Sequence, residues 1–171
     1  MPANIEIKAR IVDMGEFRRR AEALSGRPCE FLQQEDTFFH VAAGRLKLRV
    51  LAPDHGQLIY YRRPDQPGPK RSDYDVAETD QPETLKHILG EACGTRGVVR
   101  KARALYLIGQ TRIHLDEVEG LGQFMELEVV LRPGQPDADG QAIAAELMAK
   151  LGVNASDLVD SAYIDMLQSQ I

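Results

Sequence analysis

The segment Gln110–Leu131 constrains the fold of this chain more than any other part of the sequence. Its first half, Thr111–Asp116, alternates between polar and aliphatic side chains, and its second half, Phe124–Val130, does the same after a turn at Gly120–Gly122. Because successive residues of a strand point to opposite faces, this pattern predicts a β-hairpin with one polar face. That face carries Arg112, His114, Asp116, Glu126 and Glu128.

On an ordinary hairpin such a face points to water, and its charges only make the surface soluble. In this sequence, however, the same alternation recurs on at least three other predicted strands with basic side chains. The clearest is Arg45–Leu51, in which Arg45, Lys47 and Arg49 alternate with aliphatic residues. This recurrence of opposite charge argues against a merely solvated hairpin.

The periodicity along the chain predicts about eight mostly antiparallel strands interspersed with helices, which is an α+β domain spanning residues 1–171. Besides the hairpin, the expected strands are Asn4–Val12, Gln34–Val41, Arg45–Leu51, Gln57–Arg63, Ser72–Glu78 and Val98–Ile108. The expected helices are one capped by Asp13 that ends near Leu24, then Glu83–Cys93, Asp137–Leu151, and a last one capped by Ser156 or Asp157 that ends near Leu167.

The composition narrows the class of protein. A net charge of −5 argues against a general nucleic-acid binder, because such proteins need a broad basic surface. The two cysteines, Cys29 and Cys93, stand in no metal-binding or redox spacing, so we expect free thiols. The N-terminus lacks the apolar core of a signal peptide, and no run reaches membrane-spanning length. We expect a cytoplasmic protein without nucleic-acid or membrane partners, either a monomer or a homodimer.

The role of the charged faces depends on the sheet architecture. In a sandwich they face water, whereas in a barrel with helices on its apolar outside they face the lumen. Burying so many charges is costly unless they pair or bind a charged ligand. A polyphosphate fits the basic residues, and Mg²⁺ or Mn²⁺ fits the acidic ones. The lumen would hold Glu6, Lys8, Arg10, Lys47, Arg49, Arg62 or Arg63, Lys101, Arg103, Arg112, Asp116, Glu126 and Glu128.

Several short motifs, in this order, also match a known family. Asn4–Lys8 stands in the place of an ExExK signature, Leu46–Arg49 is a basic strand motif, and Lys101–Tyr106 fits KxRxxY. Gln34–Phe39, the hairpin and Ser161–Leu167 complete the set. From about residue 3 to residue 167, the chain resembles the CYTH domain, the family of triphosphate tunnel metalloenzymes that includes class IV adenylyl cyclases and thiamine triphosphatases.

The resemblance implies an eight-stranded antiparallel β-barrel, or tunnel, with helices packed on the outside. It implies a small-molecule triphosphate substrate with Mg²⁺ or Mn²⁺ as cofactor. The implied metal ligands are Glu6, Asp116, Glu126 and Glu128. Together with the alternation, it makes substrate-binding candidates of Lys8, Arg10, Lys47, Arg49, Arg62, Arg63, Lys70, Lys101, Arg103 and Arg112.

The basic candidates include two pairs of neighbouring residues, Arg62 with Arg63 and Lys70 with Arg71. Arg62 and Arg63 lie on opposite faces of one predicted strand, so only one can face the tunnel. We favour Arg63, which shares a face with Tyr61, although Arg62 fits the Lys-x-Pro spacing of the family about as well. Lys70 and Arg71 follow a proline-rich loop, and we expect them to close over the tunnel mouth.

The chain departs from the family signature at Asn4, where the family has the first glutamate of ExExK. An asparagine keeps an oxygen ligand but loses a charge, which weakens a second metal site. We therefore expect one firmly bound metal ion and a second that depends on substrate.

The family's tunnel supports two reactions. Hydrolysis of a triphosphate needs only a positioned water and a base, whereas cyclisation of ATP to cyclic AMP and pyrophosphate also needs a pocket for adenine and ribose. No such pocket is evident in the sequence, so we favour a metal-dependent triphosphatase acting on tripolyphosphate, a nucleoside triphosphate or thiamine triphosphate. A class IV adenylyl cyclase is the alternative, and a non-catalytic polyphosphate- or nucleotide-binding module is a second. The catalytic candidates are Lys8, Arg63 and His114, the last as a base.

Overall fold

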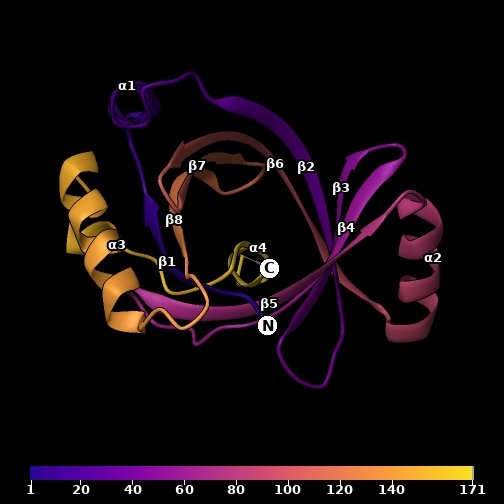
Figure 1. Ribbon diagram of the computed structural model, residues 1–171. Coiled ribbons are helices and arrows are strands. Elements are labelled where there is room, and N and C mark those ends of the chain that lie inside the picture. The colour runs from indigo at the N-terminus through magenta and orange to yellow at the C-terminus, as the bar shows by residue number, and fades with distance from the viewer. Residues whose placement is uncertain (171) are drawn as a thin grey trace.

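Eight antiparallel strands form a closed ring in the computed structural model, which describes residues 1–170 (Figure 1). Around the ring the strands follow the order β1-β5-β4-β3-β2-β6-β7-β8. This confirms the predicted α+β fold and its eight-stranded barrel. The strands are β1 (Ala3–Arg10), β2 (Glu30–Phe39), β3 (Arg45–Ala52), β4 (His55–Arg62), β5 (Lys70–Thr79), β6 (Thr95–Ile108), β7 (Thr111–Val118) and β8 (Gly122–Val130).

The strand register brings the charged positions of the sequence onto the inside of the ring. Glu6 of β1 lies opposite Glu128 of β8, and Lys8 lies opposite Glu126. His114 of β7 lies opposite Glu126 on its other side. Because paired residues in a sheet point to the same face, the charged sets of neighbouring strands share the lumen.

Helices pack against the outside of the ring of strands, as Figure 1 shows. α1 (Met14–Ser25) and α3 (Asp137–Leu151) pack on the side formed by β1, β6, β7 and β8, and α2 (Pro82–Cys93) packs on the side of β2, β3 and β4. Ile7, Leu127 and Leu147 are part of the resulting core. Where helices bury the outer faces of β1, β7 and β8, the charged faces of these strands point into the lumen.

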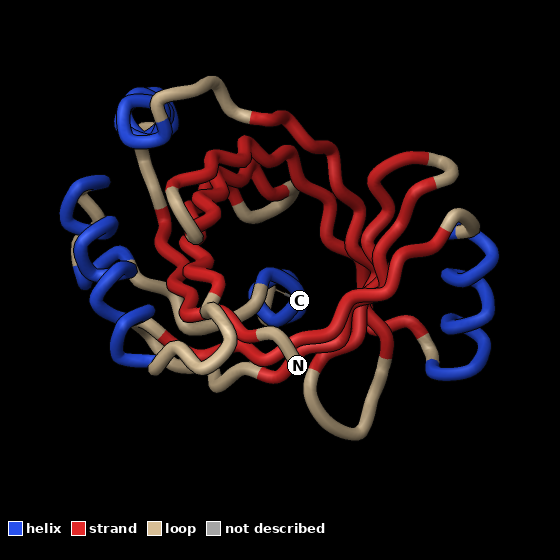
Figure 2. The backbone as a smooth tube through the Cα atoms, viewed as in Figure 1, coloured by secondary structure: helices blue, strands red, loops and turns tan. Residues whose placement is uncertain are grey.

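The C-terminal segment corrects one prediction. Instead of a continuous helix from Ser156 to Leu167, the chain forms a 3₁₀ turn, Ala155–Asp157, and then α4, Tyr163–Gln168. Between them Leu158 makes a β-bridge with Ala9, so the chain runs extended there. α4 then lies across one end of the ring, where it is visible through the barrel (Figure 2).

Other boundaries differ less. β2 begins at Glu30 and β6 at Thr95, several residues earlier than predicted, because these two strands pair along almost their whole length. α3 coincides with its predicted range. Cys29 and Cys93 are free thiols, as expected. None of the helices within residues 1–170 is long and apolar enough to cross a membrane.

Candidate functional site

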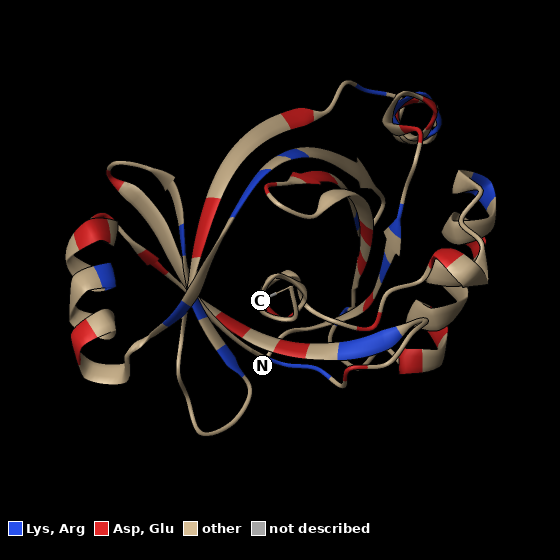
Figure 3. Cartoon of the chain, turned by 180° about the vertical axis from the view of Figure 1, so that it is seen from behind, with Lys and Arg blue, Asp and Glu red and all other residues tan. Residues whose placement is uncertain are grey.

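The barrel encloses a cavity of about 550 Å³, to which all eight strands and α4 contribute side chains. A volume of this order suits a small-molecule ligand. Seven basic and five acidic side chains line it, so the lumen has an excess of positive charge although the whole chain is acidic. Both signs of charge are distributed along the ring of strands (Figure 3). The charged lining residues are Glu6, Lys8, Glu30, Asp36, Lys47, Arg49, Arg63, Lys101, Arg103, Arg112, Glu126 and Glu128.

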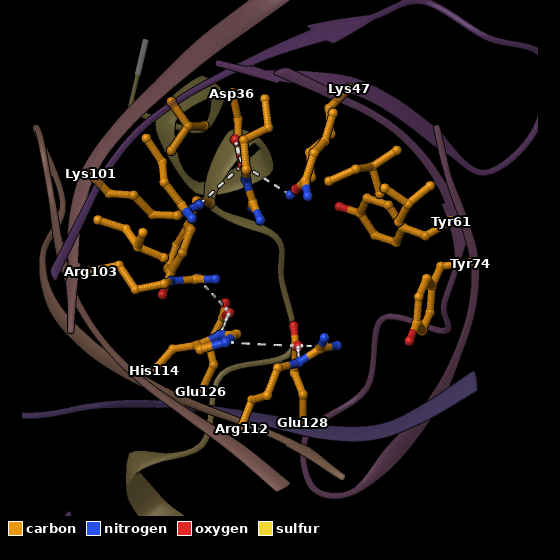
Figure 4. Close-up of a pocket in the computed structure, with 18 of the residues that line it drawn as sticks. Asp36, Lys47, Tyr61, Tyr74, Lys101, Arg103, Arg112, His114, Glu126 and Glu128 are labelled. Carbon is orange, nitrogen blue, oxygen red and sulfur yellow. Dashed lines mark hydrogen bonds and ion pairs between the residues drawn. The ribbon is translucent and has the colours of Figure 1, made fainter. Parts of the chain in front are cut away.

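One side of the lumen is a basic wall, which we define as Lys47, Arg49 and Lys101. All three side chains converge on Asp36 of β2 (Figure 4). Lys47 Nζ donates to Asp36 Oδ2 at 2.9 Å, and Lys101 Nζ donates to the same oxygen at 3.1 Å. Arg49 donates from Nε and Nη2 to both carboxylate oxygens at 2.8 and 2.9 Å. One carboxylate thus holds three cations.

Burial and mutual repulsion affect the protonation of this wall. Burial alone would raise the pKa of Asp36, but the three cations hold it well below its usual range. Burial, followed by repulsion from Arg49, lowers the pKa of Lys47 to about 7. Burial also lowers the pKa of Lys101. The charge of the basic wall therefore changes near neutral pH.

The opposite side of the lumen is an acidic pole, which we define as His114, Glu126 and Glu128 (Figure 4). One ligand atom from each of these residues lies within 4.8 Å of the others. His114 Nδ1 is 3.6 Å from Glu126 Oε2, and His114 Nε2 is 3.9 Å from Glu128 Oε2. The imidazole therefore lies between the two carboxylates that the sequence predicted to be metal ligands.

Cations also surround the acidic pole. Lys8 Nζ is 3.4 Å from Glu126 Oε1, Arg103 donates to Glu126 at 3.1 Å, and Arg112 donates to Glu128 at 2.9 Å. Burial opposes ionisation of Glu128, yet the charges of His114 and Arg112 lower its pKa to about 2. Burial, followed by the charge of Arg103, lowers the pKa of His114. At neutral pH the pole thus offers ionised carboxylates and a neutral imidazole.

This donor set fits a divalent cation. Two carboxylates suit Mg²⁺ or Mn²⁺, and the imidazole is more favourable for Mn²⁺. His114 is buried and its Nδ1 has no hydrogen-bond partner among residues 1–170. Asn4 also lines the cavity, and its buried Oδ1 likewise lacks a partner. Buried polar atoms without partners are uncommon, which is consistent with a ligand that satisfies them.

Glu6 and Arg63 form an ion pair between the two sides, with Arg63 Nη1 donating to Glu6 Oε1 at 2.6 Å. Burial raises the pKa of Glu6 although Arg63 acts to lower it. Arg63 lines the cavity, whereas Arg62 is exposed on the outside and donates to the hydroxyl of Tyr60. Of the two alternatives, only Arg63 faces the lumen. The extended backbone places neighbouring residues on opposite faces of the strand.

Four other predicted site residues are not among the residues that line the cavity. Arg10 is exposed and its guanidinium lies 5.0 Å from the centre of the Phe124 ring, outside the cavity. Lys70 of β5 pairs with Glu6 of β1 and so lies on the inward face, but it is buried and its Nζ donates to the carbonyl oxygens of Gln66 and Val159. Arg71 is on the outside, paired with Asp73 and Asp137. Arg71 therefore points away from the tunnel.

The fourth is Asp116, which lies beneath the acidic pole and is fully buried. Arg103 donates to both of its carboxylate oxygens, and Tyr163 of α4 donates to Oδ2 at 2.9 Å. Since both oxygens already accept hydrogen bonds, Asp116 acts here as the anchor of Arg103. It is not among the residues that converge as possible metal ligands.

Two site residues escaped the sequence reasoning. Asp36 lies in the Gln34–Phe39 motif, but the resemblance assigned it no role in the tunnel, and no local pattern indicates its three cationic partners. Tyr163 lies far from the barrel strands in sequence and reaches the site only through the path of the C-terminal segment. Its ring packs 5.0 Å from Phe124, and Lys8 Nζ lies 3.9 Å from its centre.

Apolar and aromatic side chains also line the cavity. Among them are Leu32, Leu51, Val76, Leu105, Tyr61 and Tyr74. These residues come from β2, β3, β4, β5 and β6. The lumen thus combines a basic wall, an acidic pole and a surface suited to an organic group.

A family model of the CYTH domain matches residues 2–163, so the chain belongs to the CYTH domain family. Over 177 residues it is 23% identical to adenylate cyclase CyaB of Aeromonas hydrophila, with 98% of this chain and 90% of that protein covered. Among solved structures it is similar to the PH1012 protein of Pyrococcus horikoshii, with a TM-score of 0.84, 24% identity, and coverage of 95% and 98%. A conserved hypothetical protein of Pyrococcus furiosus gives a TM-score of 0.83 at 19% identity, with the same coverage.

Proposed function

We propose that this protein is a metal-dependent enzyme that binds a small-molecule triphosphate in the barrel and hydrolyses it. The observation that carries the proposal is the presence of a basic wall and a metal-competent acidic pole on opposite sides of one cavity. Arginine and lysine match phosphate oxygens, while ionised carboxylates do not bind phosphate without a bridging cation. The two sides therefore suit the two halves of a metal–triphosphate complex.

Each group has a distinct task in this proposal. Lys47, Arg49 and Lys101 bind phosphate oxygens by charge-assisted hydrogen bonds. Lys8, which lies 3.4 Å from Glu126, and Arg63, which pairs with Glu6, stabilise the negative charge that develops on the reacting phosphate. A divalent ion held by Glu126, Glu128 and His114 would polarise a phosphate oxygen and offset its charge.

His114 is the candidate base for activating the attacking water. The neutral imidazole of His114 is available to accept a proton from an attacking water when it is not used as a ligand. The unpartnered Nδ1 atom supports either use. Asn4 adds an uncharged oxygen to the same region, which supports one firm metal site and a second, weaker one that depends on substrate.

Cyclisation of ATP is the second candidate. It is favoured by the likeness to the cyclase CyaB along 98% of the chain and by the apolar and aromatic residues in the cavity lining. Leucine side chains and tyrosine rings are suited to a nucleobase, which inorganic tripolyphosphate lacks. In this reaction the ribose hydroxyl replaces water as the nucleophile, and pyrophosphate leaves.

A product assay separates these activities. The protein is incubated with tripolyphosphate, ATP and thiamine triphosphate, each with Mg²⁺ or Mn²⁺, and the products are separated by chromatography. Orthophosphate release that depends on the metal supports the triphosphatase, whereas cyclic AMP with pyrophosphate identifies the cyclase. Binding of a triphosphate without turnover would indicate a non-catalytic module, and absence of binding would contradict the whole proposal.

A further inference from the structure

The basic wall contains a feature that phosphate binding alone does not require. A carboxylate in the centre of a phosphate site repels the ligand, yet Asp36 lies among the three cations that face the lumen. Its side chain is buried to 1% exposure, whereas those of Lys47, Arg49 and Lys101 are 14%, 13% and 3% exposed. The carboxylate is therefore the most deeply buried of the four groups, and Lys47 and Arg49 present more of their surface to the cavity.

The hydrogen bonds explain how this arrangement can serve a ligand. Asp36 accepts four hydrogen bonds, which use two of the five N–H groups of Arg49 and one of the three of each lysine. Within residues 1–170 these four are the hydrogen bonds that the three side chains donate. Most of their donor groups thus stay available for phosphate oxygens.

Long basic side chains lose considerable rotamer freedom when they are held in one place. When a buried carboxylate already holds them in the folded protein, this conformational entropy is lost during folding. It is then not lost again when the ligand binds. We propose that Asp36 is a positioning residue that holds Lys47, Arg49 and Lys101 converged on one phosphoryl group of the substrate. This inference rests on the proposed binding of a triphosphate in the tunnel.

The same anchor affects the charge of Lys47. The charged and titratable groups that face Lys47 are Asp36 of β2, Arg49 of β3, Tyr61 of β4 and Lys101 of β6. Burial, Arg49 and Lys101 lower the pKa of Lys47 to about 7, and Asp36 is the group that raises it. Without Asp36 the lysine would lose its proton at a lower pH, and the wall would lose a charge at neutral pH.

The variant Asp36→Asn tests this role, because it keeps the shape of the side chain and removes its charge. Binding of tripolyphosphate is measured by calorimetry without metal between pH 5.5 and 8. The matched control is Glu35→Gln, which removes a carboxylate of the same strand on its outer face, where it pairs with Lys86 and Arg100. Because tripolyphosphate changes its own protonation over this pH range equally for both variants, comparing their affinities removes that effect.

At pH 8 we expect Asp36→Asn to bind tripolyphosphate about tenfold more weakly than the control. At pH 5.5, where Lys47 carries its charge in both proteins, a deficit of about threefold should remain, because the three cations are no longer held in place. A deficit confined to pH 8 would mean that Asp36 only keeps Lys47 charged. Tighter binding at both pH values would mean that it merely repels the ligand. Either result overturns the proposal.

Asp36→Asn could fail to give a cooperative thermal unfolding transition, in which case Asp36→Glu decides. This variant keeps the charge and moves it by one methylene toward the lumen, so we expect about fivefold weaker binding at both pH values. Affinity equal to that of the wild type would overturn the positioning role. If the wild type itself does not bind tripolyphosphate at any pH, the proposed function fails as well. If it binds and Asp36→Asn behaves like the control, only this inference fails.

Discussion

At the scale of single residues, the site is organised by carboxylates that each hold several partners. Glu126 is the most connected of the acidic pole, because it lies within 3.6 Å of Lys8, Arg103 and His114. Burial would raise its pKa, but Lys8 and the other cations hold it well below the usual range. Glu126 is therefore ionised and available as a ligand at neutral pH.

Replacing Glu126 by Gln should abolish metal-dependent turnover. The amide retains the size of the side chain but removes the negative charge that a divalent ion needs, so we expect a loss of about 100-fold or more. Orthophosphate release at saturating Mg²⁺ or Mn²⁺ measures the effect, and circular dichroism checks the fold. Glu117→Gln, an exposed residue of β7, is the matched control and should retain activity. Unchanged turnover in Glu126→Gln would rule out its role as a ligand.

For single residues, strand alternation predicts the face of a side chain but not its partners. Alternation assigns a face to every strand residue, and this suffices for Lys47, Arg49, Lys101 and Arg103, all of which line the cavity. Alternation does not say how deep a side chain lies or what it binds. Asp116 is on the expected face, yet its oxygens are used by Arg103 and Tyr163.

At the scale of elements, α4 connects the C-terminal segment to the acidic pole. Tyr163 begins this helix and donates its hydroxyl proton to Asp116, which in turn holds Arg103 next to Glu126. Lys8 contacts the same segment, since its Nζ donates to the carbonyl oxygen of Ser161 at 3.0 Å. The position of α4 therefore affects side chains on three strands.

Replacing Tyr163 by Phe should destabilise the protein and impair the site together. The buried carboxylate of Asp116 would lose one hydrogen bond, which costs about 1–3 kcal/mol of unfolding free energy. We expect a smaller loss of turnover than for Glu126→Gln, because Arg103 still binds Asp116. Urea unfolding and the triphosphate assay measure the two effects. Tyr60→Phe removes an exposed hydrogen bond to Ala43 and should have little effect on either. Equal stability of the two variants would contradict this role of Tyr163.

At the scale of the whole molecule, the barrel places an excess of positive charge inside an acidic protein. Burial, followed by repulsion from neighbouring arginines, lowers the pKa of Lys47 to about 7 and that of Lys70 to about 8, from an ordinary value of 10.5. At a pH between the lowered pKa of these lysines and their ordinary value of 10.5, the folded chain binds fewer protons than the unfolded chain. The free energy of unfolding must then rise with pH.

We therefore expect the ligand-free protein to become more stable from about pH 7 to about pH 9.5, a trend set by the lowered lysine pKa values. Above this range the trend should reverse, because burial raises the pKa of Tyr61 and the folded chain then binds more protons. Urea unfolding at several pH values measures the slope. Lys47→Met should reduce the slope, whereas Lys150→Met, at an exposed site on α3, should leave it unchanged. A stability that is constant or falls over this range would contradict the prediction.

The amino-acid sequence by itself determined which side chains share a strand face, and its resemblance to the CYTH family implied the closed barrel that turns the charged faces inward. Strand alternation is local, since each residue's face follows from its neighbours, and the hairpin Gln110–Leu131 showed it clearly. Only the tertiary structure decided which charges meet. The convergence of three cations on Asp36, the outward position of Arg62 and the contact of Tyr163 with Asp116 depend on strand register, strand ends and the path of the last segment. These are long-range packing outcomes, and no local pattern encodes them.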